Sequence, residues 1–148
     1  ENPGDPRWRV PRLEVDRAVD LAFATYDVAE LAADPWGWRS ELETWADRHG
    51  ERRVIEWNTA HAVRMGPATD RMYAAAVDHG FSHDGDPRLA LHIAHCVAKA
   101  TNNGDLVSKD KRNSPRKIDA AVAAIVALDR AAWHTNNRSK KRARSFAA

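Results

Sequence analysis

Short apolar segments that alternate with amphipathic ones are the feature of this sequence that most limits its fold. Residues 28–33 form an apolar-rich run that stops at Asp34-Pro35, and residues 53–57 form a second apolar run. Proline disfavours ladder pairing and favours extended geometry in the residue before it, so the first run predicts a strand that ends at Asp34. Residues 36–48 between the runs carry apolar side chains at helical spacing. Strands that alternate with helices predict an α/β domain.

The rest of the chain predicts further helices and one β-hairpin. By apolar periodicity, the other helices cover residues 11–26, 65–79, 87–97 and 115–133. Gly80 suits the left-handed residue that ends a helix, and Ser114 suits the N-cap that begins the last one. Residues 102–105 read Asn-Asn-Gly-Asp. Because Asn-Gly supplies positive φ, they predict a hairpin whose strands cover residues 98–101 and 106–108.

Length and composition bound the class of protein. The 148 residues fit one domain over residues 1–137, followed by a basic tail over residues 138–148. The single cysteine, Cys96, excludes an internal disulfide framework and suits a reducing compartment. No apolar run approaches the roughly 18 residues that a membrane-spanning helix needs. The N-terminal residues lack the features of a signal peptide. We therefore expect a cytoplasmic protein with no membrane partner.

Two carboxylates are placed where metal chemistry needs them. Asp34 ends a predicted strand, and Asp119 lies in the predicted second turn of the last helix, beside the apolar stripe that begins with Ile118. Carboxylate oxygens suit hard divalent cations, and two such ions can activate a water and stabilise a leaving oxygen. Each position also has a structural explanation. An aspartate before proline is common in turns, and an acidic residue near a helix start offsets the helix dipole.

Basic residues crowd the approach to Asp119. They are Lys109, Lys111, Arg112, Arg116 and Lys117. A polyanionic partner selects clusters of this kind, and a basic loop can contact phosphates without reading sequence. The alternative is a solvated loop. For the second cluster, over residues 138–148, the alternative is a tail that only aids solubility.

A second group of residues could hold a metal. His92 and His95 are three residues apart on one predicted helix face, near Cys96, and could bind Zn²⁺, although no tight cysteine signature accompanies them. Asp84 lies in the predicted loop 82–87 and could approach a metal through water. Its alternative role is turn formation in Asp84-Gly85.

An ordered set of short motifs resembles one protein family. In chain order the motifs are Trp8-Arg9-Val10-Pro11-Arg12, Asp34-Pro35 with Trp38, Arg64-Met65, Ser82-His83-Asp84-Gly85-Asp86-Pro87, Ala98-Lys99, and Ser114 to Ala124. No single motif is specific, but the ordered set, over residues 8–133, resembles the C-terminal nuclease domain of terminase large subunits from tailed phages. The resemblance is strongest to phages of actinobacterial hosts. That family usually shows asparagine where this chain has His95.

The resemblance implies a fold, an activity and partners. The fold would be ribonuclease H-like, and the activity would be two-metal, Mg²⁺- or Mn²⁺-dependent endonucleolytic cleavage of concatemeric double-stranded phage DNA during genome packaging. Asp34 matches the family's second acidic position and Asp119 its third, with Asp84 near the cleft. The expected partners of the full-length protein are the portal protein and the small terminase subunit. The expected location is the host cytoplasm, at the procapsid portal.

The family's first catalytic aspartate and first strands have no counterpart in this sequence, and neither does the ATPase domain. We therefore expect the chain to begin after them, as a fragment or a shortened relative. Three hypotheses stay open. The chain is an active nuclease domain, a catalytically incomplete module that binds DNA or the packaging motor, or one half of a split protein. The first predicts metal-dependent nicking, and the second predicts salt-sensitive DNA binding without cleavage.

Overall fold

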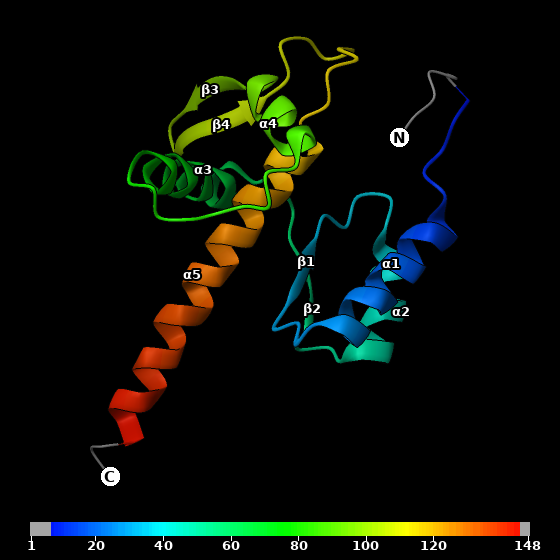
Figure 1. Cartoon of the computed structure of the whole chain (residues 1–148), viewed down its shortest axis with the longest axis vertical. Coiled ribbons are helices and arrows are strands. Elements are labelled where there is room, and N and C mark those ends of the chain that lie inside the picture. The colour runs from blue at the N-terminus through cyan, green and yellow to red at the C-terminus, as the bar shows by residue number, and fades with distance from the viewer. Residues whose placement is uncertain (1–6, 146–148) are drawn as a thin grey trace. The chain divides into compact units, whose positions relative to one another are not determined.

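The computed structural model describes residues 7–145, and it describes side chains as far as residue 137 (Figure 1). These residues separate into two compact units, the first ending at Trp57 and the second beginning at Asn58. This division does not test the predicted domain boundary at residue 137. The predicted basic tail, residues 138–148, falls where side chains are not described, and its last three residues lie outside the described residues altogether. None of the described helices is long and apolar enough to span a membrane.

The first unit is a strand–helix–strand element covered by another helix. Its members in chain order are α1 (Arg12–Thr25), β1 (Leu31–Ala33), α2 (Arg39–His49) and β2 (Val54–Glu56). The two strands pair in parallel, with Leu31 opposite Val54 and Ala33 opposite Glu56. The predicted strands, connecting helix and α/β class are confirmed. Both strands are shorter than predicted, and β1 ends at Ala33, immediately before Asp34-Pro35.

The core of this unit lies where α2 packs on the strands. Leu42, Trp45 and Val54 are buried there, and α1 contributes partly buried apolar side chains. The indole Nε1 of Trp45 donates a hydrogen bond to Asp16 of α1 at 2.8 Å. Arg48 of α2 donates to the carboxylate of Asp20, also on α1, at 2.6 Å. Apolar burial and these polar contacts together fix α1 against α2.

The second unit combines three helices with an antiparallel hairpin. Its elements are α3 (Ala62–Val77), α4 (Pro87–Ala94), β3 (Val97–Thr101), β4 (Gly104–Ser108) and α5 (Asp119–Ser145). The hairpin pairs Val97 with Ser108 and Thr101 with Gly104, which has a positive φ of 102°. The predicted Asn-Gly hairpin is therefore confirmed. Its loop has two residues, because Gly104 and Asp105 already belong to the strand.

The start of α5 differs from the prediction. The helix begins at Asp119, so Asp119 lies in its first turn, and Ser114 is not its N-cap. The hydroxyl of Ser114 instead accepts a hydrogen bond from the Arg116 N–H at 3.3 Å, inside the preceding loop. The helix also runs on to Ser145, twelve residues beyond the predicted end at Trp133. Ile125 of the helix is buried, as is Ile118 directly before it, as the apolar stripe predicted.

Two other helix boundaries also differ. Helix α4 ends at Ala94, because Val97 already pairs with Ser108 in the hairpin. Helix α3 ends at Val77, and His79, not Gly80, adopts the left-handed conformation with φ 52°. The N–H of Gly80 then donates to the carbonyl of Ala75 at 2.7 Å. This is the 6→1 hydrogen bond of a Schellman motif, so Gly80 occupies the position after the left-handed residue.

Candidate functional site

Asp34 follows the end of β1, as the sequence predicts. The side chain is half-buried, and its Oδ1 accepts a hydrogen bond from the backbone N–H of Trp36 at 2.9 Å. Such an Asx turn is the structural role that competes with metal binding at this position. The carboxyl ends of parallel strands meet at one edge of a sheet, and chemistry in α/β proteins gathers at such edges. Glu56 ends the neighbouring strand β2, where Arg39 lies 3.6 Å from its carboxylate.

Asp119 is the first residue of α5, in the second unit. Its side chain is exposed, whereas Ile118 before it is buried. The carbonyl of Ile118 accepts the first intrahelical hydrogen bond, from Val122 at 3.0 Å. The positive end of the helix dipole favours a carboxylate here, whatever else the residue does. The arrangement holds the carboxylate beside buried residues of the helix and leaves it accessible to a ligand.

His92 of α4 and His95, the C-cap residue directly after that helix, contact the backbone around Asp119. His92 Nδ1 accepts a hydrogen bond from the Ala120 N–H at 2.9 Å, and His95 Nδ1 lies 3.0 Å from the carbonyl oxygen of Lys117. The sequence spacing predicted one shared helix face but not this role, and the helix itself ends at Ala94, before His95. No group of three metal-ligating side chains occurs anywhere in residues 7–137. The structure therefore gives no support to a zinc site at these histidines.

Asp84 lies in an exposed loop shaped by consecutive side chain to backbone hydrogen bonds. Its Oδ1 accepts from the Asp86 N–H at 3.0 Å, and Asp86 in turn caps α4 by accepting from the Arg88 N–H at 2.8 Å. Gly85 between them has a φ of 82°. The Arg88 guanidinium beside Asp86 lowers the pKa of that carboxyl to about 2. Asp84 thus fills the turn role that the sequence offered as the alternative to metal binding.

The predicted basic residues lie in the loop between β4 and α5. Lys111, Arg112 and Lys117 are exposed and form no ion pair with any residue that the structure describes. Arg116 lies 3.7 Å from the carboxylate of Asp110. A hydrogen bond from Ser114, together with the charge of Arg116, lowers the pKa of Asp110. The loop therefore presents mainly uncompensated positive charge, immediately before Asp119 in the sequence.

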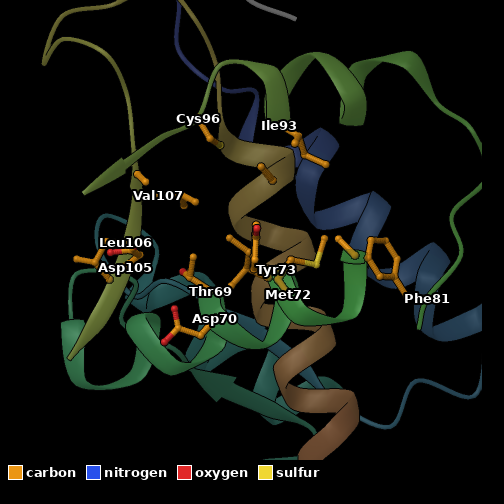
Figure 2. Close-up of a pocket in the computed structure, with 14 residues that line it drawn as sticks. Thr69, Asp70, Met72, Tyr73, Phe81, Ile93, Cys96, Asp105, Leu106 and Val107 are labelled. Atoms are coloured by element: carbon orange, nitrogen blue, oxygen red, sulfur yellow. The ribbon is translucent and has the colours of Figure 1, made fainter. Parts of the chain in front are cut away.

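An apolar pocket of about 430 Å³ occupies a different part of the second unit (Figure 2). Its walls come from α3, the hairpin and α5, with Met72, Leu106 and Ile125 among them. Cys96 also borders it, and burial raises the pKa of this thiol. None of the predicted carboxylate or basic site residues lines the pocket. The candidate site is therefore defined by the carboxylates and the basic loop, not by this pocket.

Comparison with known proteins decides the family. The model of the family described as "Terminase large subunit, endonuclease domain" matches residues 13–135. This chain belongs to that terminase endonuclease family. The match includes Asp34, Asp84, Asp119 and the whole basic loop, so every predicted site residue lies inside the family domain.

Three relatives illustrate the similarity of this terminase domain to curated proteins. The "Gene 13 protein" of Mycobacterium phage L5 is 29% identical over 129 residues, and that of Mycobacterium phage D29 is 28% identical over 129 residues. These alignments cover 80% of this chain and 22% of each relative. "Protein YmfN" of Escherichia coli (strain K12) is 32% identical over 105 residues, 70% of this chain and 22% of the relative. The chain thus spans about a fifth of the length of these relatives. No solved structure gives a significant match.

Proposed function

We propose that this chain is a metal-dependent DNA endonuclease domain that cuts concatemeric phage DNA during genome packaging. The observation that carries the proposal is the family match, because it spans residues 13–135 and contains both candidate carboxylates. We further propose that the domain is ribonuclease H-like and occupies the C-terminal part of an actinobacteriophage-type large subunit. The parallel strand–helix–strand element with Asp34 after its first strand supports this fold.

In this proposal Asp34 and Asp119 ligate Mg²⁺ or Mn²⁺, with Asp84 contributing through water. The donor set fits these ions, because it consists of carboxylate oxygens and contains no thiolate or imidazole. When bound, two such ions activate a water and stabilise the leaving oxygen of the phosphodiester. Asp34 presents its carboxylate from the end of a strand, and Asp119 from the first turn of a helix. Asp119 is thus attached to a helix and Asp34 to the residue directly after a strand, and attachment to or beside rigid elements favours well-positioned ligands.

The basic loop supplies the second part of the proposed activity. Lys109, Lys111, Arg112, Arg116 and Lys117 contact backbone phosphates of double-stranded DNA and hold the duplex without reading its sequence. In the full-length protein, the proposed partners are the portal protein and the small terminase subunit. The proposed place of action is the host cytoplasm, at the procapsid portal.

One observation favours a second candidate function. The Oδ1 atom of Asp34 already accepts a hydrogen bond from the Trp36 N–H at 2.9 Å. A DNA-binding or motor-binding module on the same fold, without cleavage activity of its own, agrees with this structural role of the carboxylate. It differs from the first candidate in requiring no metal.

Calorimetric titration with Mn²⁺ separates the two candidates. We expect the wild-type chain to bind Mn²⁺, and Asp34→Asn and Asp119→Asn each to weaken the affinity at least about tenfold, since each removes a charged ligand. Asp47→Asn is the matched control, because Asp47 is an exposed carboxylate of α2 outside the candidate site. A folded wild-type chain that binds no Mn²⁺, or variants that bind as wild type does, would contradict the proposed metal site.

A further inference from the structure

The backbone on both sides of Asp119 is tied by two imidazoles, those of His92 in α4 and of His95, the C-cap residue of that helix. The Ala120 N–H donates to His92 Nδ1 at 2.9 Å, and His95 Nδ1 donates to the carbonyl oxygen of Lys117 at 3.0 Å. Both histidines are half-buried, and they lie one turn of helix apart. The carbonyl of His92 also accepts from the Cys96 thiol at 3.3 Å. Asp119 is exposed, and it lies between Lys117 and Ala120, whose backbone groups bind the two histidines.

His92 supplies the hydrogen-bond acceptor for the first turn of α5 that the residues directly before the helix do not. The first N–H groups of a helix have no partner inside the helix, and the side chain of the preceding residue usually accepts from the second or third. Here the preceding residue is Ile118, whose side chain is buried and has no hydrogen-bonding atom. The hydroxyl of Ser114, the N-cap that the sequence predicts, instead accepts from the Arg116 N–H in the loop. The acceptor for the Ala120 N–H therefore comes from another helix.

The two hydrogen bonds also fix the roles of the ring nitrogens. His92 accepts at Nδ1, so its neutral ring carries the proton on Nε2. His95 faces a carbonyl oxygen, which can only accept, so its Nδ1 carries a proton. Each ring therefore contacts the segment 117–120 through Nδ1, the ring nitrogen nearer its own backbone. Because this connection is short, the side chains have little freedom to move, and they hold residues 117–120 at a set distance from α4.

We infer that His92 is a positioning residue for Asp119, with His95 holding the chain just before it. The inference rests on the proposed function only in giving Asp119 a metal to bind. The tether itself is a property of the second unit. Replacing a residue that orients a metal ligand without itself binding the metal typically weakens metal affinity about 10–100-fold. Here the orientation acts through the backbone of the first helical turn, so the low end of that range applies.

Three variants of α4 test the tether. His92→Asn keeps an acceptor, because asparagine Oδ1 can occupy the place of Nδ1, whereas His92→Leu keeps bulk and removes the acceptor. His92→Ala is the milder replacement if the leucine does not fit. Leu91→Ala is the matched control, since Leu91 is 53% exposed. The readouts by NMR are amide exchange at Ala120 and the backbone order parameter of Asp119. A third readout is the dissociation constant for Mn²⁺.

In His92→Leu we expect Ala120 exchange to rise about fivefold, the effect of losing a typical helix cap. The order parameter of Asp119 should fall from about 0.85 towards 0.6. The Mn²⁺ dissociation constant should rise about tenfold. His92→Asn and Leu91→Ala should stay close to wild type. This rescue by asparagine distinguishes a hydrogen-bonded tether from general packing.

The results separate failure of this inference from failure of the proposed function. Unchanged exchange and order at residues 119 and 120 in His92→Leu and His92→Ala would overturn the tether. Loss of order with unchanged Mn²⁺ affinity, while Asp119→Asn abolishes binding, would overturn positioning and leave the nuclease proposal standing. If the wild-type chain binds no Mn²⁺, the nuclease proposal fails. The NMR readouts then still decide whether His92 orders Asp119.

Discussion

Gly66 of helix α3 lies so close to the hairpin turn that a β-carbon on it would stand 2.0 Å from the carbonyl oxygen of Asn103. No real β-carbon tolerates that separation, and the atom it would meet belongs to the backbone, which cannot rotate away. The hairpin therefore packs directly on the surface of α3, at a buried position. Glycine is required there for close approach and not for an unusual φ.

Replacing Gly66 with alanine should destabilise the second unit. The hairpin and α3 must separate to admit the methyl group, and overpacking of this kind costs about 1–3 kcal/mol or more in the free energy of unfolding. Urea denaturation followed by circular dichroism measures the change. Gly80→Ala is the control, because a β-carbon there meets nothing closer than 3.5 Å. Equal stability of the two variants would contradict the close packing.

The order of the loop before α4 should depend on the charge of Asp86. Its carboxylate caps the helix and binds Arg88, which lowers its pKa from 3.8 to about 2. Because the folded pKa lies below the unfolded one, the contribution to stability is complete well above pH 4. It is lost as pH falls through 3.8 towards 2. Protection from amide exchange at Arg88 and Leu89, measured as the ratio of the intrinsic to the observed exchange rate, should therefore fall between pH 5 and pH 2. Asp86→Asn, which keeps an acceptor without the charge, should lack that fall, and identical profiles would count against the ion pair.

The basic loop should control DNA affinity and its salt dependence. The logarithm of the DNA-binding constant falls linearly with the logarithm of the salt concentration. We expect the double variant Lys111→Ala with Arg112→Ala to make this fall less steep by about 2, since each lost phosphate contact removes about 1. Fluorescence anisotropy with a labelled duplex at several salt concentrations gives the slope. Lys99→Ala, an exposed lysine on β3, serves as the control. A slope that Lys99→Ala changes as much as the loop variant does would indicate non-specific charge instead of a defined contact.

Local signals in the sequence predicted the elements that hold Asp34 and the hairpin. Proline after Asp34 ends β1 by removing a ladder donor, and this cue depends on no distant residue. The Asn-Gly pair likewise closes the β3–β4 hairpin through the positive φ of Gly104. These features are encoded within a few residues of where they act, so composition and spacing were enough to find them.

The start of α5 could not be predicted in the same way. Ser114 and Pro115 carry the usual signals of a helix start, yet the helix begins at Asp119, where His92 accepts from the Ala120 N–H. The residue that caps the helix lies 28 positions away in the sequence. Local capping rules cannot detect such a partner, so they predict Asp119 one turn too far into the helix. The spacing of His92 and His95 is the available signal, but by itself it indicates a candidate zinc site.

Nicking of supercoiled plasmid is the most direct test of the proposed metal-dependent endonuclease activity. The chain would be incubated with plasmid and Mn²⁺ or Mg²⁺, with an EDTA control. Asp34→Ala, Asp119→Ala and the control Asp47→Asn would be assayed alongside. We expect metal-dependent conversion to nicked and linear forms by wild type and Asp47→Asn, and loss of this conversion in the other two variants. A well-folded chain that binds the plasmid but never cuts it, or cutting that survives both alanine variants, would contradict the proposed activity.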